Sequence, residues 1–191
     1  YKRQLYARGS ALLRLERIEE CLESHMRGRQ VVIDHLSSNP LRLLTAQMGI
    51  GVAEARLGNL DEARRLYDDA LELARSQFGN DASLVADILG FLSDVDQAEG
   101  DSANAKARSR ESLRILRKIY GDEHPLVAAG YGDLGEILTG PGELEEGEQL
   151  IRRAIEISEA RREPDSVITA IHRCRLGMNL VYQRRTTDAI D

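Results

Sequence analysis

The chain has 191 residues, and 42% of them are hydrophobic, which is enough for a continuous core built mainly from Leu, Ile, Val and Ala. The formal net charge is −6 and the basic residues are scattered among acidic ones, which argues against nucleic-acid binding, because that function usually shows a basic patch. No apolar run approaches the roughly 20 residues that span a bilayer, and no secretory signal is visible, so the sequence predicts no membrane segment.

Helical periodicity and turn residues predict a chain made of helices throughout. In chain order we expect helices near 2–14, 17–36, 40–57, 60–77, 82–98, 102–119, 125–139, 143–161 and 165–183, followed by a helical stub from about Thr186. Pro125 suits the first position of a helix, because its fixed φ fits there and its missing N–H is not needed. Gly58 and Gly100 stand where we expect the chain to turn, because glycine tolerates the left-handed conformation that ends many helices.

These helices recur in pairs with a period of 42 residues. Gly58, Gly100 and Gly142 keep this step, and Leu92, Leu134 and Leu176 keep it too. The period divides the chain into units at about 1–39, 40–81, 82–123, 124–164 and an incomplete 165–191. A fixed period of this length predicts a repeat protein, in which neighbouring units stack to bury a shared core. We therefore expect one all-α solenoid domain of about four and a half helix pairs.

Small residues also return at the repeat interval. They are Gly51, Ala63, Ala70, Ala105, Ser112, Gly135, Gly147, Ala154 and Gly177. Two antiparallel helices approach closely only where a side chain is short, so we expect the small residues of first helices to face those of second helices. Ala70, Ser112 and Ala154 are expected to let the next unit pack. A Leu at any of these positions would overpack the contact, at a typical cost of about 1–3 kcal/mol.

The repeats resemble a known family. Leu134-Gly135, Gly142-Glu143-Leu144, Gly147 and Ala154 are similar to the tetratricopeptide repeat, and His124-Pro125-Leu126-Val127-Ala128 resembles its longer subtype in kinesin light chains. HEAT-type units have a similar length but would not predict this set of small residues. The resemblance implies a right-handed α-α superhelix with first helices lining the concave side, and it implies a subtype that is also common in bacterial signalling proteins.

The chain departs from the kinesin light chain pattern in its first helices. That family carries an Asn pair there for binding peptide backbones. The matching positions here are Met48-Gly49, Gly90-Phe91, Gly132-Asp133 and Cys174-Arg175. We therefore do not expect this mode of peptide capture.

Two local patterns suggest cofactor or metal binding, and both favour a structural interpretation. Gly130-Tyr131-Gly132-Asp133-Leu134-Gly135 matches G-x-G-x-x-G, but a dinucleotide site needs a preceding strand, and these glycines lie inside a predicted helix. Cys21 and His25 share a helix face, but no second pair of ligands accompanies them. No catalytic motif is present. The sequence thus predicts a non-catalytic protein without metal or cofactor.

The inner surface of the first helices is the candidate binding groove. We expect it to be lined by Met48, Val52, Arg56, Asp87, Phe91, Asp94, Asp133, Glu136, Arg175 and Met178. The middle of this set is acidic with apolar neighbours, which favours a basic or amphipathic segment of a partner protein. The alternative is a solvated groove that has no ligand in this chain.

The ends of the chain suggest its context. It starts at Tyr1 and stops within a repeat, so we expect a segment of a larger, bacterial protein. The last first helix is apolar and lacks its partner helix, so it is expected to stack on a further repeat or on another copy of the chain. Cys21 and Cys174 lie too far apart to pair, which favours a reducing compartment and hence the cytoplasm.

The predicted function is a protein-interaction module of a regulatory or scaffold protein. The alternative is a ligand-sensing or self-assembly segment of a bacterial signalling protein, such as a kinase or a nucleotide-switched regulator. An enzyme would need a cluster of perturbed acids or a metal site, which the sequence does not supply.

Overall fold

The computed structural model describes residues 18, 20, 23, 26, 27, 30, 40–140, 142–160 and 167–188. Within this part of the chain there are seven helices and no strand. The chain divides into two compact units, Tyr1–Asn80 and Asp81–Asp191. The predicted helix at 2–14 lies outside the described residues, as do Cys21 and His25, and the described positions within 17–36 are helical.

The first unit contains the hairpin of α2 (Pro40–Leu57) and α3 (Leu60–Phe78). Gly58 turns the chain between them with a φ of 88°. The ring of Tyr67 on α3 packs over Gly51 on α2, where a Cβ would lie only 2.5 Å from the ring atom Cε1. Tyr67 is 1% exposed, so the missing side chain at Gly51 makes room for the largest group of this hairpin core.

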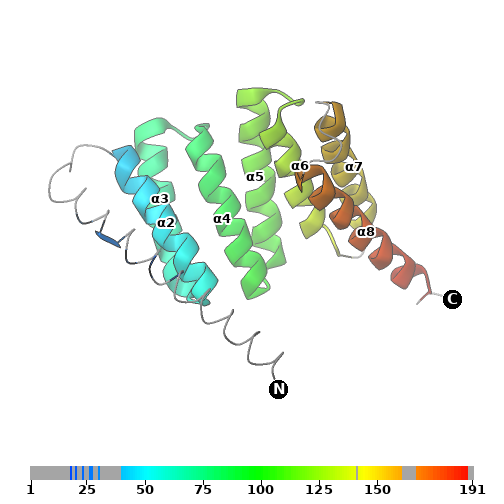
Figure 1. The fold of residues 1–191 in the computed structure, drawn as a ribbon, viewed down its shortest axis with the longest axis horizontal. Helices are drawn as coiled ribbons and strands as arrows, with labels where there is room; N and C mark the ends of the chain where they lie inside the picture. The colour runs from blue at the N-terminus through cyan, green and yellow to red at the C-terminus, as the bar shows by residue number, and fades with distance from the viewer. Residues whose placement is uncertain are drawn as a thin grey trace, which may run out of the picture. The chain divides into compact units, whose positions relative to one another are not determined.

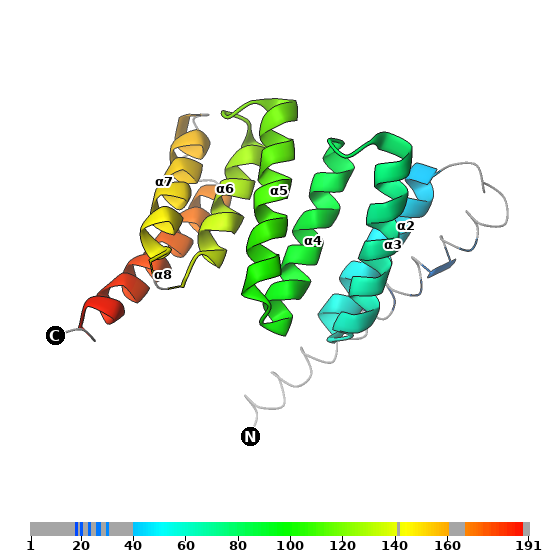
Figure 2. The same ribbon diagram turned by 180° about the vertical axis from the view of Figure 1, so that it is seen from behind.

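The second unit contains five consecutive helices, shown in Figure 1. They are α4 (Ser83–Glu99), α5 (Ser102–Tyr120), α6 (Pro125–Ile137), α7 (Leu144–Ala160) and α8 (Val167–Asp188). Each helix packs against the next, and α6 also contacts α8. Helix α8 lies on the near side in Figure 1 and α7 on the near side in Figure 2, so first and second helices of the repeats form two layers.

Local residues define the helix ends in this unit. The side chain of Asp101 accepts a hydrogen bond from the backbone N–H of Asn104 and caps α5. Before α6, the ring nitrogen Nδ1 of His124 accepts from the N–H of Leu126, and Pro125 takes the first helical turn as predicted. Gly100 ends α4 in the left-handed conformation, with φ 83° and ψ 9°. These caps explain why the helices begin and end where the repeat pattern predicts.

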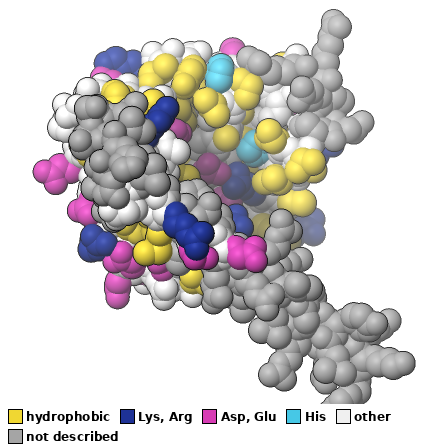
Figure 3. Space-filling model, turned by 60° about the vertical axis from the view of Figure 1, so that its left-hand side comes forward, with side chains coloured by type: hydrophobic (Ala, Val, Ile, Leu, Met, Phe, Trp, Pro, Cys, Tyr) yellow, Lys and Arg dark blue, Asp and Glu magenta, His cyan; other side chains and the backbone are white. Residues whose placement is uncertain are grey.

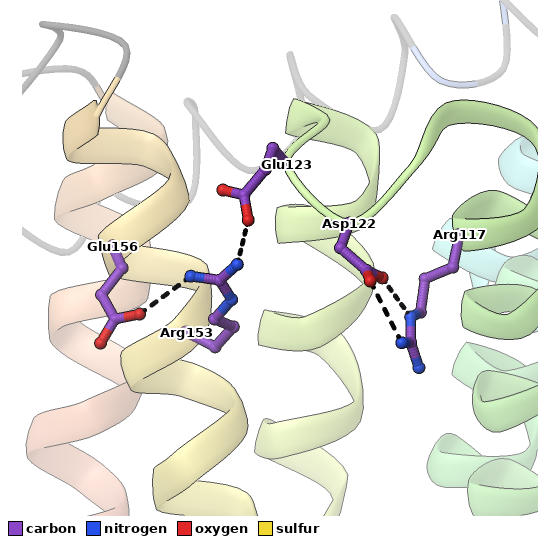
Figure 4. A network of polar contacts seen from close by, with 5 residues as sticks. All are labelled: Arg117, Asp122, Glu123, Arg153 and Glu156. Carbon is purple, nitrogen blue, oxygen red and sulfur yellow. Dashed lines mark hydrogen bonds and ion pairs between the residues drawn. The ribbon is translucent and has the colours of Figure 1, made fainter.

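The loop between α5 and α6 is held by ion pairs with arginines of α5 and α7, which are drawn in Figure 4. Arg117 of α5 pairs with Asp122, and Arg153 of α7 pairs with Glu123 and Glu156. These residues are all at least one-third exposed, so each pair contributes little on its own. Together they link the loop to the hairpins on either side of it.

The three glycines of the G-x-G-x-x-G pattern lie inside α6 and face three different helices. A Cβ at Gly130 would lie 3.2 Å from Leu113 of α5, and one at Gly132 would lie 2.4 Å from His172 of α8. A Cβ at Gly135 would lie 2.6 Å from Ile151 of α7. The pattern therefore serves close helix packing around α6.

Helix α8 corrects one prediction. We expected a turn before a new helical stub at Thr186, but α8 continues through this residue to Asp188. The turn glycines Gly58, Gly100 and Gly142 have positive φ, whereas the equivalent position 42 residues later is Arg184. An arginine has no preference for the left-handed conformation, so the helix does not end there. Ala189, the small residue expected in the following helix, lies outside the described residues.

Candidate partner-binding surface

Helices α4, α6 and α8 share a face that carries most of the predicted groove residues of the second unit. We call it the α4–α6–α8 face. Its residues are related by the 42-residue repeat or by about one helical turn. They are Asp87, Phe91, Asp94, Asp133, Glu136, Arg175 and Met178. Phe91 and Arg175 are half-buried and the other five are exposed. In Figure 3, a recess holds acidic side chains beside Lys or Arg side chains, and hydrophobic side chains border it.

The centre of this face is an ion-pair network between α6 and α8. The guanidinium of Arg175 reaches Asp133 at 2.8 Å through Nη2 and Glu136 at 2.6 Å through Nε. The two acids lie about one turn apart on α6, so both point toward the same guanidinium. The Arg175 side chain is only 21% exposed. The predicted acidic groove thus already contains a cation that neutralises part of it.

Asp94 of α4 lies close enough to this network for the charges of Asp133, Glu136 and Arg175 to act on it. Partial burial raises its pKa to about 6, and the negative charges of Asp133 and Glu136 add to this effect, whereas Arg175 opposes it. Among the described residues, the Asp94 carboxylate forms no hydrogen bond or ion pair, and only the longer-range charges of Asp133, Glu136 and Arg175 act on it. Such a carboxylate gains from a cation brought close to it.

Burial also affects the other acids of the face. It raises the pKa of Asp87, and it raises the pKa of Asp133 despite the opposing charge and hydrogen bond of Arg175. Raised carboxylate pKa values mean that the charged form is poorly stabilised by its surroundings. A positive charge placed near the acids of α4 would therefore stabilise their charged form.

His172 lies beneath Arg175 on α8 and is 2% exposed. Its burial and the neighbouring Arg175 lower its pKa, which favours the neutral form of the ring. Neither ring nitrogen has a hydrogen-bond partner among the described residues. Both His172 and Arg175 lie against Gly132, where a Cβ would lie 2.4 Å from Nδ1 of His172 and 2.8 Å from Nη1 of Arg175. The burial of this histidine could not be predicted from the sequence, because it depends on the contact with Gly132 of α6.

The remaining predicted groove residues belong to the first unit. Met48 and Val52 of α2 are half-buried and Arg56 is exposed. They follow one another at intervals of four residues and so lie on one side of α2. They belong to a different compact unit from the α4–α6–α8 face, so a common groove formed with its acids stays a prediction.

The small residues lie at the close contacts of hairpins. In α6 and α7, a Cβ at Gly147 would be 2.8 Å from the carbonyl oxygen of Gly135. In α4 and α5, the hydroxyl of Ser93 donates to the carbonyl of Ala105 at 2.9 Å, and Ser112 donates to the carbonyl of Ala86 at 2.8 Å. Ser112 thus binds within its own hairpin, and its expected role in admitting the next hairpin stays a prediction.

Other small positions differ in their surroundings. Ala63, Ala70, Ala105 and Ala154 have no exposed surface. Gly177 on α8 is exposed, and a Cβ there would meet nothing within 4 Å. The position that is crowded in α2 and α6 is therefore open in α8.

Helix α8 has an inverted distribution of polar and apolar side chains. It buries Thr169, His172 and Asn179, and the Asn179 side chain donates to the carbonyl of Leu144 on α7 at 3.1 Å. Its exposed large hydrophobic residues are Val167, Ile168, Ile171, Met178, Leu180, Val181 and Tyr182. These seven are more than half of the thirteen such residues found in the described part of the chain. An apolar face of this kind is typical of an interaction surface.

A second charged feature lies on α5, where a hollow of about 410 Å³ is lined by cationic side chains. Arg110 pairs with Glu146, and Arg114 and Lys118 both pair with Asp81. Because nearby acids neutralise these cations, the hollow offers little net charge for an anionic ligand. We assign it to packing between hairpins.

The described residues contain no group of three or more His, Cys, Asp or Glu side chains placed to hold a metal ion. Within the same residues, no helix has both the length and the apolarity of a membrane span.

Comparison with known proteins shows a repeat family that part of the chain resembles. Residues 42–118 match the tetratricopeptide repeat family. Over 109 residues, the chain is 30% identical to Protein KINESIN LIGHT CHAIN-RELATED 2 of Arabidopsis thaliana; this match covers 56% of the chain and 16% of that protein. The chain thus spans about a sixth of the length of this relative.

Solved structures agree at the level of the fold. The crystal structure of BtubC (BKLC) from P. vanneervenii superposes with a TM-score of 0.76 at 17% identity, covering 87% of this chain and 66% of that one. A Podosopora anserina protein with nearly identical TPR-like repeats gives a TM-score of 0.71 at 16% identity, covering 99% of this chain and 91% of that one. The predicted all-α repeat fold is therefore confirmed.

Proposed function

Because the chain is a tetratricopeptide-repeat protein that resembles kinesin light chains, we propose that its α4–α6–α8 face binds a basic, amphipathic segment of a partner protein. Such repeats form protein-interaction modules, and the proposal adds the site and the chemistry of the partner. The proposal depends mainly on the state of Asp94. Its carboxylate has a pKa raised to about 6 and forms no ion pair among the described residues. A cation from the partner would relieve this unfavourable charge.

The apolar surroundings of the acids support an amphipathic partner. Ile171 and Met178 of α8 are 45% and 55% exposed, and Leu126 of α6 is 45% exposed. Charged groups would fix the orientation of the bound segment, and apolar side chains would anchor it. We place this module in a regulatory or scaffold assembly without catalysis. The free, exposed thiol of Cys174 fits a reducing compartment such as the cytoplasm.

Charge reversal at Asp94 tests the proposal. A short fluorescein-labelled peptide of alternating Arg and Leu residues serves as the probe, and fluorescence anisotropy at low salt measures its dissociation constant. We expect Asp94→Lys to weaken binding roughly tenfold or more, because it removes an attractive charge and adds a repulsive one. Glu145→Lys makes the same change in net charge at an exposed position of α7 and serves as the control.

The pH dependence of the same titration gives a second reading of this test. Protonation of Asp94 near pH 6 removes its charge, so affinity for the probe should fall as the pH is lowered through this range. The arginines of the probe keep their charge over this range. Asp94→Asn should flatten the pH profile. Equal effects of the Asp94 and Glu145 replacements would reject the proposed face.

We also propose that α8 mediates self-association through its exposed apolar side chains, with a second copy of the chain as the occupant. Val167 is 75% exposed and Val181 is 45% exposed, which is unusual for large apolar residues on a helix that otherwise buries polar ones. Analytical ultracentrifugation over a range of concentrations should show reversible association. Val181→Glu should weaken it roughly tenfold, since burying a charge in place of an apolar group is unfavourable.

The matched control for this experiment is Leu41→Glu, which changes a 51% exposed leucine of α2 in the first unit. It should leave association unchanged. A strict monomer at high concentration would contradict this second proposal without affecting the first.

A further inference from the structure

Arg175 is the cation that the acidic residues of the α4–α6–α8 face already hold. Its Nη2 lies 2.8 Å from Asp133 and its Nε lies 2.6 Å from Glu136, so one guanidinium joins two carboxylates. This arrangement uses two donors of the planar fork, which a lysine ammonium does not reproduce. The face therefore has the geometry of an arginine receptor, and the arginine comes from the chain itself.

The position of Arg175 in the repeat is not reserved for a cation. The residues one and two repeats earlier are Asp133 and Phe91. Helix α8 has other contacts that fix it on α6 and α7, among them His172 against Gly132 and the hydrogen bond from Asn179 to Leu144. In addition, Gln183 donates to Glu148 at 2.6 Å. The attachment of α8 thus does not depend on Arg175 alone.

The ion-paired position of Arg175 has an unfavourable neighbour. His172 beside it is buried, and both of its ring nitrogens lack a hydrogen-bond partner in the described part of the chain. A buried polar group without a partner is unfavourable. If Arg175 leaves, water or the partner can reach His172, while Asp133 and Glu136 become available to another guanidinium.

We infer that Arg175 is an intramolecular stand-in for an arginine of the partner, and that it sets the specificity and affinity of the face by competing for Asp133 and Glu136. This inference rests on the proposed function, because it concerns the same face and the same kind of partner. In the free chain Arg175 occupies both carboxylates of α6, so an approaching partner first meets mainly the carboxylates of α4. In the complex its arginine displaces Arg175 and takes both carboxylates of α6.

If Arg175 competes with the partner, removing its guanidinium should strengthen binding. We expect Arg175→Gln to bind the Arg–Leu probe roughly three- to tenfold more tightly than the unchanged chain, because two carboxylates become available. A peptide in which Lys replaces Arg should gain less, since it lacks the planar fork. Arg173→Gln is the matched control. It removes the same charge at a position two residues earlier, where the side chain is 52% exposed.

A double-mutant cycle separates competition from a change in stability. In the unchanged chain, Asp133→Asn should alter probe affinity by less than about twofold, because Arg175 occupies this carboxylate. In the Arg175→Gln background the same replacement should remove most of the gain. Far-ultraviolet circular dichroism and thermal melting of each variant show whether α8 keeps its packing.

The outcomes distinguish the inference from the proposed function. If Asp94→Lys weakens binding but Arg175→Gln and Arg173→Gln have equal effects, the face binds a basic segment and Arg175 is not a competitor. If Arg175→Gln weakens binding, Arg175 contacts the partner directly and the inference is wrong. If neither Asp94→Lys nor Arg175→Gln changes binding relative to its control, the proposed function itself fails.

Discussion

Replacing Gly147 with alanine is expected to destabilise the second unit, whereas the same replacement at Gly177 is expected to stabilise it. A Cβ at Gly147 would lie 2.8 Å from the carbonyl oxygen of Gly135 and 3.0 Å from that of Leu138. Backbone atoms cannot rotate away, so α7 must move from α6. We expect a loss of about 1–3 kcal/mol in the free energy of unfolding, the usual range for overpacking.

Gly177 occupies the equivalent position to Gly135 one repeat later, yet its surroundings are open. A Cβ there would meet nothing within 4 Å. Alanine favours a helix over glycine by up to about 1 kcal/mol, and no clash opposes this gain. Urea denaturation followed by circular dichroism measures both variants, and a change of 1 kcal/mol corresponds to roughly 2–4 °C in melting temperature for a chain of this size.

Gly90→Ala provides a second control, because Gly90 of α4 also has no atom within 4 Å of an added Cβ. It should behave like Gly177→Ala. A destabilising Gly177→Ala with a stabilising Gly90→Ala would mean that another surface covers α8 in solution, and self-association would then be the first explanation to examine. Equal effects at Gly147 and Gly177 would contradict the packing seen around α6.

The repeat pattern predicted the helices closely because turns and small residues are local signals. Helix α2 has the predicted bounds, and α4, α5 and α7 differ from prediction by one residue at either end or both. The prediction failed at α8, where the pattern was extended to position 184 although an arginine stands there instead of the turn glycine. Helix bounds follow from the residues present, and periodicity alone does not end a helix.

The candidate site was predictable only in part. Helical spacing placed Asp94, Asp133 and Glu136 on one face, and the structure places their charges close enough to interact. The sequence did not predict that Arg175 neutralises two of these acids, because this pairing depends on how α8 packs against α6. Nor did it indicate that His172 is buried with no hydrogen-bond partner in the described ranges. Contacts between helices from different repeats decide both features.

Asp96 is another residue whose role the pattern concealed. Its side chain has no exposed surface, and Arg108 of α5 pairs with it at 3.1 Å. The residues one repeat later are Leu138, which is also completely buried, and Leu150. Aligning the repeats shows that an acid in one repeat stands where the next has a leucine. This difference indicates a buried ion pair only once the burial of the position is known.

Arg108→Ala is therefore expected to lower the free energy of unfolding by roughly 3–5 kcal/mol, because it removes a charged partner from a completely buried carboxylate. Replacing both residues as in the next repeat, Asp96→Leu with Arg108→Leu, should recover most of this loss, since well-packed hydrophobic residues often substitute for a buried ion pair without net cost. Urea denaturation of both single variants and the double variant gives the coupling energy. If the double variant were as unstable as Arg108→Ala, the two hairpins would pack too differently at these positions to exchange side chains, and repeat equivalence would not extend to the interior of α4 and α5.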